Sequence, residues 1–200
     1  MTKFELAQRF QQEFQELIGE ERAKLKAEIV SKDILPSEEF GQHSPEVTVQ
    51  ESGKVAVHGP HKGYAYVLAE NLYQQGIAKL KLKLESFQNN YWMFVGMIKG
   101  DVVLPRPPNN DSYGWCGSYG WELGTHGAVY NDRFYTAETS LSDVTKQGDT
   151  VDLVLDCDAA KLSLHLPNGL QFHVEIPKSQ TWRLNVTLYR SNDKIRIINE

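Results

Sequence analysis

Hydrophobic and polar residues alternate in short stretches over most of the chain. The clearest stretch is residues 77–84, where three leucines at alternate positions face one side and three lysines face the other. This alternation is typical of a β-strand with one buried face and one face in water. Residues 91–98 are apolar on both faces and therefore predict a central strand.

Further stretches of this kind follow one another along the chain, with turn residues between them. They cover residues 47–50, 54–58, 65–68, 151–158, 161–166, 170–176, 182–189 and 194–199. The pair Asn168-Gly169 is typical of a tight turn between two strands. About ten short strands without helices between them predict an all-β fold, either a sandwich or a barrel.

The N-terminal part differs from the rest, because residues 2–30 are rich in Gln, Glu, Lys, Ala and Leu. Hydrophobic residues recur there at helical spacing, namely Phe10, Phe14, Leu17, Ile18, Leu25 and Ile29. Thr2 and Glu5 have the spacing of a capping box. We expect an amphipathic α-helix over residues 1–30 that docks on its own domain or on a second copy, which would give a homodimer. The heptad pattern is too short and irregular to establish a coiled coil.

A linker is expected over residues 31–46, because Pro36, Gly41 and Pro45 stand there among polar residues. The sandwich domain is then expected over residues 47–200. The length of 200 residues suits one domain with a short extension.

Composition and charge restrict the class of protein. Hydrophobic residues make up 40% of the chain, which is typical of a globular protein. The net charge of −5 argues against a nucleic-acid-binding protein, which usually has a basic face. No apolar run approaches the length of a membrane span, and the first residues have no apolar signal-peptide segment. We expect a soluble, cytoplasmic protein without a nucleic-acid or membrane partner.

The cysteines and histidines give no metal-binding pattern. Cys116 and Cys157 are the two cysteines, and without a Cys-x-x-Cys pair they exclude a thiolate zinc site. Free thiols in a reducing compartment are the simpler interpretation, with a disulfide between them as the alternative. His58 and His61 lie in a Gly-Pro loop without further metal ligands nearby in the sequence. We expect no metal and no cofactor.

The tetrapeptide Ser-Tyr-Gly-Trp occurs twice, at residues 112–115 and 118–121. In the second copy Trp121 and Leu123 share one face of a strand, which predicts that Trp121 lies in the core. Gly120 is expected to give the space that the large indole needs beside a neighbouring strand.

The first copy follows residues 105–111, a proline-rich and polar stretch that does not suit a central strand. We therefore expect Tyr113 and Trp115 to lie on a loop and to present their rings to water. Tyrosine and tryptophan offer large contact areas with few rotatable bonds, which favours recognition. In the alternative interpretation Trp115 folds back and caps the end of the sandwich.

Five motifs in this order resemble the SPRY family, a domain found at the C-terminal end of many tripartite-motif proteins. They are Phe94-Val95-Gly96-Met97, Tyr119-Gly120-Trp121-Glu122-Leu123-Gly124-Thr125, Gly148-Asp149-Thr150-Val151 with Leu155-Asp156-Cys157-Asp158, Leu162-Ser163-Leu164 with Asn168-Gly169, and Trp182-Arg183-Leu184-Asn185-Val186-Thr187-Leu188-Tyr189. The resemblance covers residues 45–198. It implies an antiparallel two-sheet β-sandwich of the concanavalin-like jelly-roll type. It also implies a ligand surface made by loops at one end, usually for short peptide segments of partner proteins.

The resemblance also indicates binding residues. Tyr113 and Tyr189 match aromatic positions that line the pocket of peptide-binding SPRY domains. Residues 58–62 correspond to an Arg-Pro-type loop of that pocket, although the arginine is absent here. Arg106 and Arg190 are expected to supply cationic contacts. The expected ligand-binding residues are Tyr113, Trp115, Arg106, Pro60, His61, Tyr189 and Arg190.

Catalytic patterns are weak in this sequence. A retaining glycosidase needs two carboxylates about 5 Å apart across the sugar. Asp156 and Asp158 have suitable spacing, but they flank a turn, where carboxylates usually accept backbone N–H bonds. No Gly-x-Ser-x-Gly elbow and no Gly-rich phosphate loop are present. We therefore expect no enzymatic activity.

Three functions are compatible with these features. The first is a non-enzymatic module that binds a short peptide segment of a partner protein. The second is a lectin-like module, in which Trp115 stacks on a sugar beside Asn109, Asn110 and Asp111. The third is a structural module that dimerises through residues 1–30. In a ubiquitin ligase assembly the peptide-binding module would recognise the substrate, with the catalytic parts on another chain.

Overall fold

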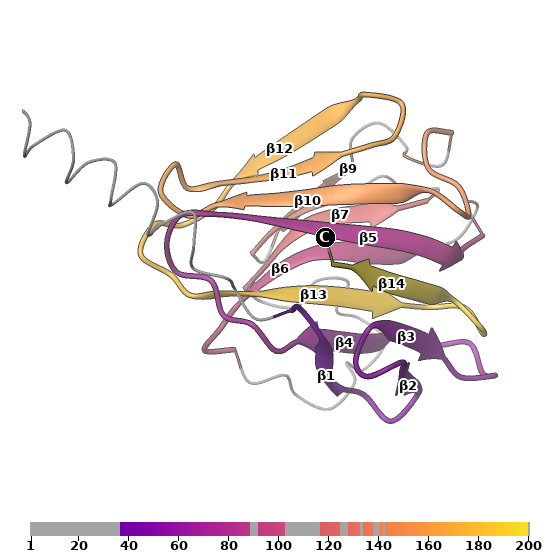
Figure 1. Ribbon diagram of the computed structural model, residues 1–200. Coiled ribbons are helices and arrows are strands. Elements are labelled where there is room, and N and C mark those ends of the chain that lie inside the picture. The colour runs from indigo at the N-terminus through magenta and orange to yellow at the C-terminus, as the bar shows by residue number, and fades with distance from the viewer. Residues whose placement is uncertain are drawn as a thin grey trace, which may run out of the picture. The chain divides into compact units, whose positions relative to one another are not determined.

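The computed structural model describes residues 37–88, 92–102, 117–124, 128–132, 134–137, 141 and 143–199. Within these ranges the chain forms fourteen β-strands (Figure 1). They are β1 (Phe40–His43), β2 (Val47–Gln50), β3 (Val55–His58), β4 (Ala65–Ala69), β5 (Ile77–Ser86), β6 (Met93–Lys99), β7 (Ser118–Leu123), β8 (Ala128–Asp132), β9 (Phe134–Ala137), β10 (Thr150–Asp156), β11 (Lys161–His165), β12 (Gln171–Glu175), β13 (Trp182–Leu188) and β14 (Lys194–Ile198). The helix expected over residues 1–30 lies outside the described residues. None of the described residues forms a helix that could span a lipid bilayer.

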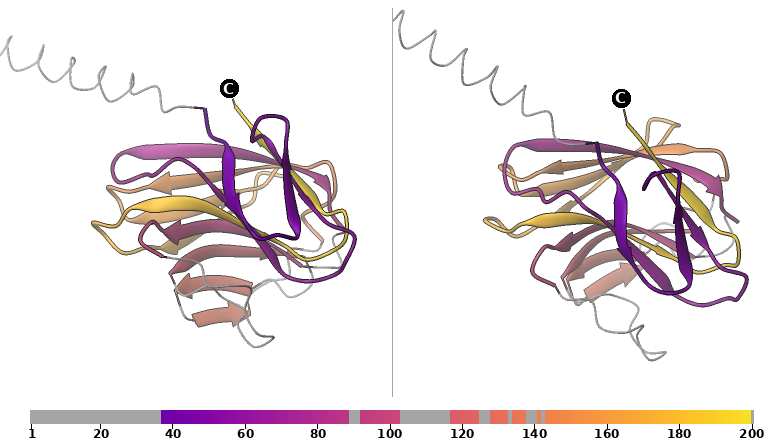
Figure 2. Two further views of the ribbon diagram at one scale, coloured as in Figure 1. Left: turned by 90° about the horizontal axis from the view of Figure 1, so that it is seen from below. Right: turned by 60° about the horizontal axis from the view of Figure 1, so that its bottom comes forward.

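The strands form two sheets of seven strands each, and paired neighbours run antiparallel. Sheet A has the order β1-β4-β13-β6-β7-β8-β9, and sheet B has the order β12-β11-β10-β5-β14-β3-β2. The two sheets pack as two layers (Figure 2). The predicted antiparallel two-sheet sandwich is therefore confirmed.

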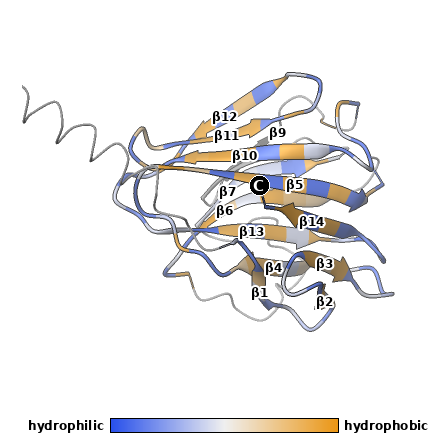
Figure 3. Cartoon of the chain, viewed as in Figure 1, coloured by the Kyte–Doolittle hydropathy of each residue, from blue (hydrophilic) through white to orange (hydrophobic). Residues whose placement is uncertain are grey.

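The alternating pattern of residues 77–84 places β5 in sheet B with one face inward. Leu80, Leu82 and Leu84 are buried, whereas Lys79 and Lys83 are exposed. In the neighbouring strand β10, every second residue is buried in the same way, and both strands show alternating hydropathy (Figure 3). Side chains at alternate positions point to opposite faces of a sheet, so the leucines of β5 face sheet A and the lysines face solvent.

The core lies between the two sheets and contains large aromatic side chains. Trp121 of β7 and Trp182 of β13 are each only 1% exposed. The rings of Tyr119 and Trp182 meet edge to face with their centroids 5.2 Å apart. The prediction that Trp121 belongs to the core is confirmed.

Gly96 of β6 and Gly120 of β7 lie directly opposite each other in sheet A. A Cβ atom on Gly120 would lie 2.4 Å from the carbonyl oxygen of Val95 and 3.1 Å from the end of the Phe94 ring. Gly120 thus makes room for the backbone of β6 and for Phe94, on the face opposite to Trp121. The expectation that this glycine accommodates the Trp121 indole was wrong in this respect.

The outer face of sheet A is buried as well, unlike the outer face of sheet B. Leu68, Ile98, Asn185 and Thr187 all belong to this face and are almost fully buried. The Asn185 side-chain amide donates a hydrogen bond of 3.2 Å to the Ser118 hydroxyl oxygen, across the glycine position of β6. Burial on both faces explains why residues 91–98 show no alternation.

Strand β1 lies inside the stretch that was expected to be a linker, residues 31–46. Phe40 is buried, and its backbone N–H donates to the carbonyl oxygen of Gly53 over 2.7 Å. The buried Glu38 carboxylate accepts hydrogen bonds from the Asn71 backbone N–H, at 3.1 Å, and from the Tyr73 hydroxyl. Residues 37–46 therefore belong to the sandwich, and only residues 31–36 of the expected linker lie outside the described ranges.

Candidate interaction site at one end of the sandwich

Two loops meet at one end of the sandwich. The β3–β4 loop (residues 59–64) and the β13–β14 loop (residues 189–193) connect strands of different sheets. The Gly63 backbone N–H donates to the Tyr189 carbonyl oxygen over 3.0 Å. The His58 N–H donates to the Asp193 carbonyl oxygen over 2.9 Å, just before the first loop begins. These backbone bonds hold the two loops side by side.

An aromatic cluster forms where these loops approach the start of β6. Tyr64 and Trp92 meet edge to face with ring centroids 4.9 Å apart, and Tyr64 and Tyr189 lie 4.6 Å apart at a tilt of 40°. Trp92 and Phe94 are buried, whereas Tyr64 and Tyr189 are half-buried. We call Tyr64, Trp92 and Tyr189 the aromatic cluster. Its three rings are held by three different segments of the chain.

Residues with basic side chains lie on the two loops that carry Tyr64 and Tyr189. The ammonium group of the exposed Lys62 lies 5.0 Å from the centroid of the Tyr189 ring, which is a cation–π distance. His61 is exposed next to it, and Arg190 is half-buried on the other loop. The one acid of these two loops, Asp193, is only 3% exposed. The outward-facing charge of the two loops is therefore positive, although the whole chain carries −5.

Asp193 organises the β13–β14 loop from inside. Its carboxylate oxygen accepts hydrogen bonds from the backbone N–H groups of Arg190, at 2.8 Å, and Tyr189, at 3.3 Å. Burial raises the pKa of Asp193, while the two backbone N–H groups and the nearby His58 lower it, with a net rise. The carboxylate thus fixes the backbone that presents Tyr189 and Arg190.

His58 organises the β3–β4 loop in a similar way. It is 1% exposed, and its ring nitrogens Nδ1 and Nε2 lie 3.0 Å from the Gly59 carbonyl oxygen and 2.7 Å from the Gly63 carbonyl oxygen. Both partners are acceptors, so a ring that carries both N–H groups donates to both, whereas a neutral ring donates to one. These two contacts bracket Pro60, His61 and Lys62.

Four of the seven expected ligand-binding residues lie together in this region. Pro60 and His61 are exposed on the β3–β4 loop, and Tyr189 and Arg190 lie on the β13–β14 loop. The other three, Arg106, Tyr113 and Trp115, lie outside the described residues.

The flanks of residues 103–116 belong to the opposite end of β6. The Lys99 backbone N–H donates to the Gly117 carbonyl oxygen over 3.0 Å at the last residue of β6. The aromatic cluster lies next to the first residue of that strand. A strand of seven residues spans about 20 Å, so Lys99 and Gly117 lie at the other end of the sandwich from the aromatic cluster.

Three residues of this region, Lys62, Tyr64 and Trp92, were not among the expected ligand-binding residues, although Lys62 belongs to the 58–62 loop that the resemblance indicated. The predicted strand 91–98 included Trp92, but in the structure β6 begins at Met93, the residue after Trp92. No local signal marked Tyr64 or Trp92, because an aromatic residue next to a loop can equally enter the core, as Trp182 at the start of β13 does.

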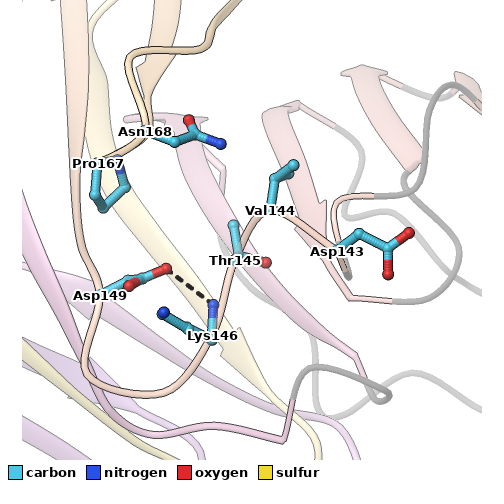
Figure 4. A pocket seen from close by; sticks show the side chains of 7 residues that line it. All are labelled: Asp143, Val144, Thr145, Lys146, Asp149, Pro167 and Asn168. Atoms are coloured by element: carbon cyan, nitrogen blue, oxygen red, sulfur yellow. Dashed lines mark hydrogen bonds between the residues drawn. The ribbon is translucent and has the colours of Figure 1, made fainter.

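A hollow of about 500 Å³ occurs elsewhere at the same end of the sandwich, between the loop before β10 and the β11–β12 turn (Figure 4). Both β10 and β14 begin beside the last residues of β5. The loop before β10, which lines the hollow, and the β13–β14 loop therefore lie at the same end of the sandwich. Some of the hollow's polar groups are engaged in local hydrogen bonds. The Asp149 carboxylate accepts from the Lys146 N–H at 3.0 Å, and the Thr145 hydroxyl donates to the Leu141 carbonyl oxygen at 2.7 Å. Of the expected ligand-binding residues that the structure describes, none lines this hollow.

The described residues contain no group of three or more His, Cys, Asp or Glu side chains that could hold a metal ion. Cys157 is a free thiol, and burial together with the neighbouring Asp158 and Asp156 raises its pKa. The Asp156 carboxylate accepts from the Ala159 N–H at 2.7 Å, and the Asp158 carboxylate accepts from the Gly76 N–H at 3.2 Å. The expected turn role is therefore confirmed for Asp156, whereas Asp158 accepts from Gly76 of the distant β4–β5 loop and not from its own turn.

The arrangement of the two sheets is that of SPRY domains. The SPRY domain of human HERC1 matches with a TM-score of 0.62 and 18% sequence identity, over 80% of this chain and 97% of that domain. The PSpry domain of TRIM65 matches with a TM-score of 0.61 and 10% identity, over 82% of this chain and 90% of that domain. These likenesses establish the SPRY fold. No protein-family model matches the sequence. No curated protein sequence matches it either.

Proposed function

We propose that this chain is a non-enzymatic interaction module that captures a segment of a partner protein at the aromatic cluster. The SPRY fold of the two structural neighbours supports a role in protein–protein interaction in general. The observation that supports this location is the half-exposed Tyr189, which packs on Tyr64 and lies beside Lys62.

The physical basis of binding is the burial of aromatic surface on a rigid frame. Aromatic residues at the centre of an interface often account for about 2 kcal/mol or more of the binding free energy. Tyr189 is suited to this role because His58 and Asp193 fix the backbone on both sides of the cluster. A fixed cluster loses little conformational entropy when a partner binds.

A peptide-display library tests this proposal. We expect the full chain to retain a set of peptides and the variant Tyr189→Ala to bind them at least tenfold more weakly, because it loses the exposed ring. Leu72→Ala is the matched control, since Leu72 is an exposed hydrophobic residue on the β4–β5 loop at the other end of the sandwich. The control should bind like the unchanged protein.

Two results would contradict the proposal. One is the absence of retained peptides, and the other is equal affinity of the unchanged protein and Tyr189→Ala for the retained set. A glycan array run in parallel distinguishes peptide binding from the lectin-like alternative, because binding of sugars without binding of peptides would support that alternative.

A further inference from the structure

The charge of the two loops points to the chemistry of the segment that they would bind. Three residues with basic side chains lie on these loops, namely the exposed His61 and Lys62 and the half-buried Arg190. Asp193 is buried, and its carboxylate accepts hydrogen bonds from two backbone N–H groups of its own loop. A positively charged surface on a chain of net charge −5 attracts acidic partners.

Lys62 is placed to contact an anion. Its ammonium group lies over the Tyr189 ring, and no carboxylate among the described residues forms an ion pair with it. A cation–π contact uses the charge of the ammonium group but leaves N–H donors for other acceptors. Lys62 is thus held beside the aromatic cluster with donors available.

Trp92 contributes a second donor to the same region. The residue is 9% exposed, and its indole Nε1–H has no acceptor among the described residues. A buried donor without an acceptor is unfavourable, so such groups in proteins usually have a partner. The indole packs edge to face against Tyr64, the ring that lies closest to both other members of the aromatic cluster.

We infer that the segment captured by this module is acidic, with a side-chain carboxylate bound by Lys62. The aliphatic part of that side chain and the adjacent backbone pack on Tyr64 and Tyr189. The Trp92 indole N–H donates to an oxygen of the same segment. This inference rests on the proposed function and adds to it the class of peptide that is recognised.

The test measures the composition of peptides retained from a random twelve-residue library. For the unchanged full chain we expect enrichment of Asp and Glu over the input library. Lys62→Glu should abolish this enrichment and weaken the binding of a retained acidic peptide at least tenfold, because two like charges then meet. Lys178→Glu makes the same charge change on the exposed β12–β13 loop and should leave both measurements unchanged.

A second variant tests the indole donor. Trp92→Phe keeps an aromatic ring and removes the N–H group. We expect it to weaken the binding of the acidic peptide about threefold to tenfold, which is the range of one hydrogen bond. Thermal unfolding of each variant verifies that the sandwich is intact. An unchanged affinity in folded Trp92→Phe would remove the indole from the site.

The outcomes separate this inference from the proposed function. If peptides bind in a manner that depends on Tyr189 but show no excess of acidic residues, the acidic segment is excluded and the interaction module stands. If Lys62→Glu retains the acidic preference, the role of Lys62 is excluded. If no peptides are retained, or if only sulfated or sialylated glycans bind, both the proposed function and the acidic peptide are excluded.

Discussion

At the scale of single residues, the loop end depends on two buried ionisable side chains. His58 contacts the carbonyl oxygens at both ends of the Pro60–Lys62 segment, and Asp193 accepts two N–H groups of the neighbouring loop. Both are almost fully buried. Polar groups in such places are costly unless they are hydrogen-bonded, and here each is bonded to backbone. Their role is to position the exposed residues of the loops.

We expect His58→Phe to lower the free energy of unfolding by about 1 to 3 kcal/mol, because the Gly59 and Gly63 carbonyl oxygens lose the hydrogen bonding that the His58 ring supplies. Urea denaturation measures the change. His61→Phe is the matched control, since His61 is exposed on the same loop and should change stability by less than about 0.5 kcal/mol. Equal effects of the two substitutions would contradict the positioning role of His58.

At the scale of the strands, the close approach of β6 and β7 depends on the facing glycines, Gly96 and Gly120. A Cβ atom on Gly120 would lie 2.6 Å from the Gly96 Cα atom, and this neighbour is backbone that cannot rotate away. The same pair leaves room on the outer face for Phe94, which packs with Trp92 below the aromatic cluster. Strand spacing and the candidate site are therefore connected through Phe94.

We expect Gly120→Ala to destabilise the sandwich by about 1 to 3 kcal/mol, the usual cost of adding a methyl group to a closely packed site. Gly63→Ala is the control, because a Cβ atom there would meet nothing within 4 Å. Thermal and urea unfolding should show no loss for Gly63→Ala. A Gly120→Ala protein as stable as the unchanged chain would show that β6 and β7 can separate without cost.

The strands also show which features a sequence can predict. β5 and β10 were predicted well, because one wet face leaves an alternating pattern. β1 was missed because Gly41 and two nearby prolines resemble a linker, and its burial depends on pairing with the distant β4. Trp92 was placed inside a strand because nothing local marks where the apolar run 91–98 leaves the sheet.

At the scale of the whole molecule, distant segments form the candidate site only because both sheets are complete. Pairing of β14 with β3, and of β13 with β4, brings the β13–β14 loop to the β3–β4 loop. Pairing of β13 with β6 adds Trp92. The resemblance to SPRY domains indicated Pro60 and Tyr189, whereas no local pattern could indicate the contacts among Lys62, Trp92 and Tyr189. These contacts depend on strand register.

We expect a fragment of residues 37–200 to fold and to unfold in one cooperative transition, because Glu38 and Phe40 attach its first residues to the sandwich. A fragment of residues 47–200 should be clearly less stable, since it loses β1 and leaves β4 as an uncovered edge. Circular dichroism during heating compares the two fragments. Equal melting temperatures would show that β1 is dispensable.

The position of Trp92 gives the protein an optical reporter. Trp121 and Trp182, the other tryptophans among the described residues, are enclosed between the sheets, so their fluorescence responds mainly to unfolding. Trp92 lies against two tyrosine rings, and its centroid is 6.5 Å from that of Tyr189. An occupant of the aromatic cluster would alter the polarity around this indole and shift its emission. Titrations can then be followed on the unlabelled chain.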